Sequence, residues 1–176
     1  MVTVGFSLGN RADECVSGLE QTLRNSFGFK LFTILSYFPP PKGAVRIYST
    51  RPDLHPLGRR QPTKVPVPVP IRRQNWIHQV IVEGRTWRGC NKEDLKAVFE
   101  DWELLWSAGL GSVLNIPLRK NGVTMGSLNI LDKEHAYNTA DLGLAEQIAD
   151  LVAPCVQKTA AEEGETQEPK NSSARI

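Results

Sequence analysis

The sequence predicts an α+β domain, in which helices cover paired β-strands. Three observations predict this class: a central β-hairpin that is apolar on both faces, a second hairpin nearer the N-terminus, and an amphipathic helix at each end of the chain. The chain has 176 residues. That length is enough for one domain that buries roughly 70% of its unfolded surface.

The central hairpin covers residues 109–132, where two runs rich in Val, Leu and Ile flank Asn121-Gly122. Asn-Gly readily adopts the positive φ angles of a two-residue type I′ turn. If these two residues form the loop, the facing pairs are Lys120–Val123, Leu118–Met125, Ile116–Ser127 and Leu114–Asn129. This register leaves both faces largely apolar, and such a sheet must be covered on both sides.

The elements before the central hairpin follow from hydrophobic periodicity and cap residues. Residues 11–27 should form an amphipathic helix that starts after Asn10 and ends at Gly28. Residues 29–38 and 44–50 should pair as the second hairpin, joined by a longer loop. The N-terminal half therefore supplies one helix and two strands.

The middle of the chain, from 51 to 110, is less regular. Residues 51–74 are rich in proline and lack periodicity, so they should form a long extended connection. That connection is either a lid or binding loop, or a solvent-facing insertion. Short helices are expected at 76–82, 91–99 and 102–108, with a short strand at 85–89. The last helix should follow the cap residues Asn138 and Asp141 and carry an apolar stripe to Val156.

These elements indicate one domain at 10–157, between a flexible N-terminus at 1–9 and a disordered polar tail at 158–176. The net charge of +2 gives no strong field for nucleic acid or an anionic membrane. No apolar run approaches the ~20 residues of a membrane span, and the N-terminus lacks a signal-peptide pattern. We therefore expect a cytoplasmic protein that binds neither nucleic acid nor membrane.

The three cysteines, Cys15, Cys90 and Cys155, are far apart in the sequence and odd in number. This usage argues against a disulfide framework and fits a reducing compartment. Cys15 and Cys155 lie on the apolar stripes of the two terminal helices, where core packing is the expected role.

The order of the elements and two stretches of sequence resemble those of a GAF domain. SVLNIPLRKNGVTMGSLNILD, residues 112–132, is similar to the end of such a domain, where a strand ending in proline leads to a tight turn, a glycine and a last strand. WIHQVIVEGRTWRG, from Trp76, is similar to the helix and short strand before the variable loop of the pocket. The resemblance covers residues 10–157. It implies a six-stranded antiparallel sheet, with the terminal helices on one face, often as a dimer interface, and residues 51–110 enclosing a small-molecule pocket on the other.

The chain also departs from well-known members of that family. It lacks the dispersed Asn-Lys-Phe-Asp-Glu signature of members that bind cyclic nucleotides, and no cysteine is placed for bilin attachment. Only Cys90 lies near the region where free methionine sulfoxide reductases of this fold carry pocket cysteines. No kinase, cyclase or DNA-binding domain accompanies the domain, so it should act in trans, pair with itself, or use its pocket in another way.

Two groups of side chains are candidates for function. Cys90 follows Arg88 and precedes a predicted helix, a setting that favours a catalytic thiolate but also suits a small buried residue. The candidate ligand-binding residues are mostly aromatic and lie in or beside the middle layer: Tyr37, Trp76, Trp87, Phe99, Glu103, Trp106 and Asn115. Aromatic walls suit a flat organic ligand, although the same residues could form the core beneath the middle helices. No His and carboxylate spacing suits a metal, and no cofactor is predicted.

The leading functional hypothesis is a sensor or accessory protein that binds a small organic ligand and passes its signal through the terminal helices of a homodimer. The alternative is a stand-alone enzyme that uses the same pocket, either as a thiol-dependent reductase through Cys90 or as an isomerase or cyclase acting on an organic metabolite. A third reading is a dimerisation module whose pocket is filled by its own side chains.

Overall fold

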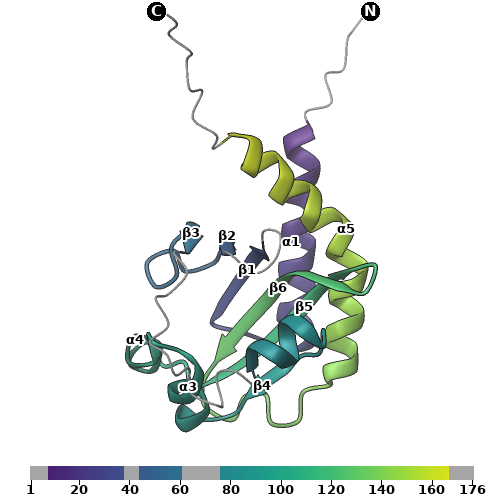
Figure 1. Ribbon diagram of the computed structural model, residues 1–176. Helices are drawn as coiled ribbons and strands as arrows, with labels where there is room; N and C mark the ends of the chain where they lie inside the picture. Colours follow the sequence, from purple (N-terminus) through teal and green to yellow (C-terminus); the bar gives the residue numbers. More distant parts are fainter. Residues whose placement is uncertain (1–7, 38–43, 61–75, 167–176) are drawn as a thin grey trace, which may run out of the picture.

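An antiparallel sheet forms the centre of the fold (Figure 1). The structure is a computed structural model, and it describes residues 8–37, 44–60 and 76–166. In chain order the elements are α1 (Leu8–Ser26), β1 (Leu31–Tyr37), β2 (Ala44–Ser49), β3 (Gly58–Arg60), the π-helical turn η1 (His78–Val82), β4 (Trp87–Gly89), α3 (Lys92–Val98), α4 (Trp102–Ser107), β5 (Ser112–Lys120), β6 (Val123–Asp132) and α5 (Leu142–Thr166).

The strand order of the sheet is β3-β2-β1-β6-β5-β4, and each neighbouring pair is antiparallel. The predicted α+β class is confirmed. Five strands, in the order β2-β1-β6-β5-β4, form the body of the sheet. The sixth strand implied by the resemblance is present only as β3, a three-residue edge piece that pairs with β2. It lies in the segment where the sequence predicted an irregular connection.

The turn of the central hairpin is confirmed, but its predicted register is wrong. Asn121 and Gly122 have φ angles of 51° and 76°, as a type I′ turn requires. The register shifts between Leu118 and Arg119, so that Leu118 pairs with Gly126 and Arg119 pairs with Thr124. Met125 is therefore the extra residue of a β-bulge, which moves every later pair by one position.

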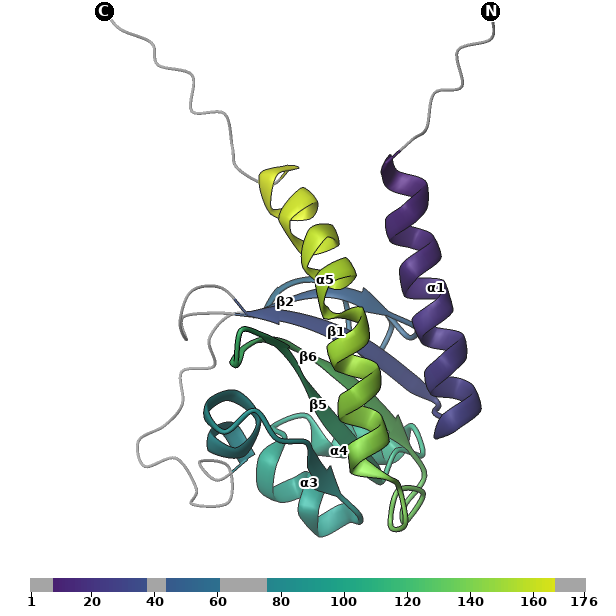
Figure 2. The same ribbon diagram turned by 90° about the vertical axis from the view of Figure 1, so that its right-hand side faces the viewer.

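The corrected register separates the two sheet faces more cleanly than the predicted one. One face carries the apolar residues Phe32, Ile34, Leu114, Ile116, Leu118, Leu128 and Ile130, packed beneath α1 and α5. The other carries Leu31, Val113 and Leu131, packed beneath α3 and α4 with Leu95, Leu105 and Leu110. Figure 2 shows α1 and α5 together on their face of the sheet. Both faces are covered, as the sequence predicts.

Two tyrosines fix α1 against the rest of the fold. Tyr48 on β2 donates a hydrogen bond to the carboxylate of Glu20. Burial and this bond raise the pKa of Tyr48 to about 12, while the bond lowers the pKa of Glu20. The Tyr137 hydroxyl donates to the carbonyl oxygen of Gly28 at 2.9 Å, which ties the loop before α5 to the end of α1. Burial raises the pKa of Tyr137 well above its usual value.

The terminal helices differ from the prediction in length and in their cysteines. Helix α5 continues to Thr166, so residues 158–166 of the predicted tail are helical, while 1–7 and 167–176 lie outside the described residues. Cys15 on α1 and Cys155 on α5 form a disulfide, with Cα atoms 6.7 Å apart. The predicted core-packing role of both cysteines and the predicted absence of a disulfide framework are therefore wrong, because α1 and α5 pack together where the two cysteines lie.

The cap predictions are partly confirmed. Asn91 caps α3, since its side chain accepts a hydrogen bond from the backbone N–H of Asp94. Asp141, rather than Asn138, caps α5 by accepting from the N–H of Leu144. The proline-rich stretch at 64–70 lies outside the described residues. Among the helices of the described part of the chain, none has the length and hydropathy needed to cross a membrane.

Candidate functional site

A strip of hydrogen-bonded polar side chains runs across the sheet on the face away from α1 and α5. Thr33, Asn129 and Asn115 stand opposite one another on β1, β6 and β5. The Asn115 amide donates to the Asn129 carbonyl oxygen at 2.7 Å, and the Asn129 amide donates to the Thr33 hydroxyl at 3.3 Å. Asn115 is only 3% exposed and Asn129 only 5%. Buried amides on an otherwise apolar face require such partners.

Trp76 extends this strip to the layer that covers the sheet. Its indole Nε1–H donates to the Asn115 carbonyl oxygen at 2.9 Å. Trp76 lies two residues before the start of η1. Val80 of η1 is buried, and its carbonyl oxygen accepts from the Thr124 hydroxyl at 3.1 Å. A π-helical turn in this place is notable because such turns occur often at functional sites.

Aromatic rings stand beside the polar strip. The Phe99 ring lies edge-on to both Trp76 and Trp87, with centroid distances of 6.1 and 6.5 Å. Trp87 on β4 is the pairing partner of Asn115 on β5. Four of the predicted ligand-binding residues, Trp76, Trp87, Phe99 and Asn115, are therefore brought together.

Tyr37, a fifth predicted residue, lies further along the same face. Its hydroxyl is 3.0 Å from that of Ser127, and Ser127 is two residues from Asn129 on β6. Because alternate residues of a strand share a face, Ser127 continues the polar strip. The strip thus spans from Trp76 at one side to Tyr37 at the other.

The sequence did not single out Arg46, His55 or Asp101 for this layer. Arg46 on β2 pairs with Leu35, and Leu35 pairs with Ser127, so Arg46 lies on the same face as the polar strip. Arg46 is 4% exposed, and its guanidinium donates to the carbonyl oxygen of Pro56 at 3.0 Å. His55 is 7% exposed, and its Nε2 lies 3.1 Å from an Asp101 carboxylate oxygen. Its buried Nδ1 has no hydrogen-bond partner among the described residues.

Two predicted ligand-binding residues lie elsewhere. Glu103 is exposed, and Trp106 is 37% exposed on α4. The ammonium group of Lys92 lies 4.8 Å from the centroid of the Trp106 ring, which suits a surface cation–π contact. Only Leu105 of the short helix α4 is buried. The prediction from residue type therefore placed Glu103 and Trp106 in the pocket layer, although both are exposed.

The backbone of Cys90 belongs to the cap of α3. Its N–H donates to an Asp94 carboxylate oxygen at 2.9 Å, and its carbonyl oxygen accepts from the N–H of His135 at 2.8 Å. Arg88 donates instead to the carbonyl oxygen of Asn138 at 3.1 Å. Cys90 carries a free thiol, but its backbone contacts run to α3 and the 133–135 turn rather than to the polar strip.

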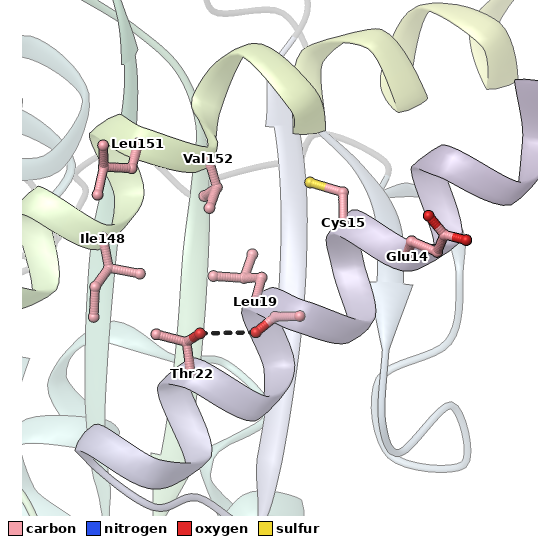
Figure 3. Close-up of a pocket in the computed structure, with 8 residues that line it drawn as sticks. Glu14, Cys15, Leu19, Thr22, Ile148, Leu151 and Val152 are labelled. Atoms are coloured by element: carbon pink, nitrogen blue, oxygen red, sulfur yellow. Dashed lines mark hydrogen bonds between the residues drawn. The ribbon is translucent and has the colours of Figure 1, made fainter.

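A concave region lies on the opposite side of the sheet from the polar strip, between α1 and α5 (Figure 3). It is an open groove of about 350 Å³ lined by Glu14, Cys15, Gly18, Leu19, Thr22, Ile148, Leu151 and Val152. Leu151 is 81% exposed at its edge. Across the described ranges, no group of three His, Cys, Asp or Glu side chains is placed to hold a metal ion.

The fold defines an α+β domain with two long helices on one sheet face and an irregular layer of short helices on the other. The model of the GAF domain matches residues 13–157. The chain therefore belongs to the GAF domain family, as the sequence indicated. No curated protein matches the chain.

Solved structures support the same fold. The GAF domain of a two-component sensor histidine kinase from Bacillus halodurans is 18% identical, with a TM-score of 0.61 over 89% of this chain and 98% of that one. A GAF domain/HD domain protein from Geobacter sulfurreducens is 13% identical, with a TM-score of 0.64 over 89% and 99%. The type II free methionine-R-sulfoxide reductase from Thermoplasma acidophilum is 12% identical, with a TM-score of 0.57 over 86% and 95%. At these identities the likeness establishes the fold alone.

Proposed function

We propose that this GAF domain binds a small organic ligand on the sheet face that carries the polar strip, and acts as a sensor or accessory binding protein. The observation that carries the proposal is the hydrogen-bonded series Thr33–Asn129–Asn115–Trp76, in which the first three side chains are buried and Trp76 is partly buried. A plain hydrophobic core gains nothing from two buried amides, because each must be satisfied. A site for a polar guest needs such groups.

The chemistry of the strip suggests the class of ligand. An asparagine amide offers two donors and two acceptor lone pairs, so bonds within the strip use only part of that capacity. Two amides on neighbouring strands can therefore present a donor and an acceptor side by side. The nearby rings of Trp76, Trp87 and Phe99 favour a flat molecule. We infer a planar organic ligand with adjacent donor and acceptor groups, such as an amide or nitrogen heterocycle.

Native mass spectrometry of the purified protein tests this proposal. We expect a co-purified molecule, or one acquired from a panel of planar heterocycles, in the wild type and in Trp106→Ala, a control on the exposed side of α4. Asn115→Ala should reduce binding at least about tenfold, because losing one hydrogen bond to a buried polar group costs ~1–3 kcal/mol. Trp76→Phe, which keeps the ring but loses the N–H, should weaken binding without unfolding the domain. Equal binding by all four proteins would contradict the proposed site.

One observation favours catalysis as a second candidate function. Asp101 accepts from or pairs with Nε2 of His55, which leaves the buried Nδ1 as the atom that could take or give a proton. This arrangement suits an isomerase or cyclase better than a thiol-dependent reductase using Cys90. Mass spectra of the molecule after incubation in D2O and return to H2O separate the two candidates. An enzyme would change its mass or leave deuterium bound to carbon, whereas a sensor would return it unaltered once its labile N–H and O–H protons have exchanged back.

We further propose that output passes through a homodimer formed by α1 and α5. The groove between these helices is apolar, and Leu144 and Leu151 expose large side chains along α5. Such a surface is typical of a protein interface. A ligand that contacts the middle layer would bias how these helices pack in the dimer.

Replacing Leu151 by Glu is expected to weaken the dimer at least about tenfold, because a carboxylate in an apolar interface loses its hydration without gaining a partner. Val82→Glu is the matched control, since Val82 is also an apolar side chain exposed to solvent but lies on η1 and does not line the groove. Light scattering across a dilution series measures both variants. A wild type that is monomeric at every concentration, or a Val82→Glu variant that dissociates as readily, contradicts this interface.

A further inference from the structure

We propose that the Cys15–Cys155 disulfide is a reversible thiol-exchange site that sets how firmly the distal part of α5 is held to α1. The bond joins residues separated by 140 positions in the sequence. It is the covalent contact between the two helices that we expect to carry output. The proposal concerns the described protein without any ligand and does not depend on the polar strip.

A proline places a weak point in α5 directly beside this bond. Pro154 lies inside the helix, and it has no N–H to donate to the carbonyl oxygen of Asp150. Helices bend at such positions. Figures 1 and 2 show the yellow distal part of α5 leaving the line of its green first part. Cys155 is the first residue beyond the proline, so the disulfide fixes the segment that the missing hydrogen bond loosens.

The first part of α5 is held by other contacts. Ala145 and Ala149 are fully buried against the sheet, and Asp150 accepts two hydrogen bonds from the Arg119 guanidinium, at 2.9 and 2.6 Å. Beyond Pro154, Val156 packs into the same core as Val16 of α1. Opening the disulfide therefore leaves residues 142–150 in place, while the segment beyond Pro154 loses its covalent link to α1 and keeps the core contact of Val156.

The bond is accessible to a small thiol. Cys15 lines the open groove between α1 and α5, and Figure 3 shows its sulfur directed from α1 toward α5 at the groove wall. Both cysteines are partly exposed. Exchange requires a thiolate to approach one of the two sulfurs in line with the bond. The groove provides that approach in the single chain, before the proposed dimer forms, without unfolding the domain.

The reaction balances with a dithiol as the reductant. A thiolate of the dithiol attacks one cysteine sulfur, the Cys15–Cys155 S–S bond breaks, and a mixed disulfide forms. The second thiol of the reductant then displaces the first cysteine. Two electrons pass to the protein, two protons end on the Cys15 and Cys155 sulfurs, and the reductant leaves as its own disulfide.

Counting thiols tests whether the bond exists. Alkylation of the denatured, unreduced protein should label one cysteine, Cys90, and alkylation after treatment with dithiothreitol should label three. Treatment of the native protein with dithiothreitol should also expose Cys15 and Cys155 to alkylation while the far-ultraviolet circular dichroism spectrum is retained. Three labelled cysteines before reduction would overturn the proposal.

Hydrogen exchange in a Cys90→Ser background tests the consequence. Reduction should speed amide exchange in residues 155–166 by roughly tenfold or more and leave residues 142–150 unchanged. Cys15→Ser should show the fast exchange without reductant. Pro154→Ala restores the missing N–H, so reduction should have a smaller effect in that variant. Equal exchange in the oxidised and reduced proteins would overturn the proposal. Loss of protection throughout the domain would also overturn it, because the disulfide would then stabilise the whole fold and not the distal part of α5.

Discussion

Gly126→Ala is expected to destabilise the domain by at least about 3 kcal/mol, an unusually large effect for a single added methyl group. A Cβ at this position would lie 2.4 Å from the carbonyl oxygen of Leu35 and 3.4 Å from a methyl carbon of Leu118. The carbonyl belongs to the backbone of β1, which is paired with β6 and with β2, so it cannot move without breaking the sheet. Strand separation, rather than side-chain adjustment, is the only relief.

Chemical denaturation of Gly126→Ala measures this loss, and Met125→Ala is its matched control. Met125 is the neighbouring residue, but it occupies the bulge and is partly exposed, so its truncation should cost less than about 1 kcal/mol. For a domain of this size, the glycine variant should lose roughly 6–12 °C in melting temperature. Similar losses of stability in both variants would contradict the explanation that the effect of Gly126→Ala comes from the close approach of the Leu35 carbonyl oxygen.

Local chemistry made the turn of this hairpin predictable, whereas its register was not. Asn121-Gly122 fixes the turn because few residues accept the φ angles at both positions. The bulge at Met125 shifts the pairing of β6 with β5 between Leu118 and Arg119, and no pattern within the hairpin predicts it. The sequence therefore predicts a two-sided apolar hairpin correctly, but from Leu118 onward it predicts pairs that are wrong by one position.

The candidate site was predictable to the same limited extent. Trp76, Trp87, Phe99 and Asn115 were expected in the layer and are found in contact there. Arg46 and His55 escaped notice because a charged residue in a half-buried strand and a histidine in a loop usually face solvent. Their burial depends on the covering layer, which sequence periodicity does not place.

The pairing of Cys15 with Cys155 is a third feature that the sequence did not predict. The stripes of α1 and α5 correctly place Cys15 and Cys155 toward the core side of each helix, but a pairing across 140 residues depends on how the helices meet. Burial of an apolar stripe predicts contact with a sheet. It does not predict which position of one helix reaches which position of the other.

The second large effect is expected at Arg119, which joins three parts of the fold. Its guanidinium binds both carboxylate oxygens of Asp150, the carbonyl oxygen of Gly84 at 2.9 Å and a carboxylate oxygen of Glu146 at 3.3 Å. The other Glu146 oxygen accepts from the N–H of Thr86 at 2.8 Å. Hydrogen bonding to Asp150 raises the pKa of Arg119, so the guanidinium stays charged. The cluster thus connects the segment that follows η1 with α5, and Trp76 lies two residues before the other end of η1.

Arg119→Met, which keeps the length of the side chain, should lower the free energy of unfolding by about 2 kcal/mol, between the values for exposed and buried ion pairs. Arg51→Met is the control, because Arg51 binds both oxygens of Asp53 in similar geometry, at 2.9 and 2.7 Å, but on the surface; no measurable change is expected there. Chemical denaturation gives both values. Hydrogen exchange adds the informative comparison: in Arg119→Met the amides of residues 84–87 should lose more protection than those of β1. A uniform loss would mean that Arg119 supports the whole fold equally, and that the ligand layer has no special connection to α5 through this residue.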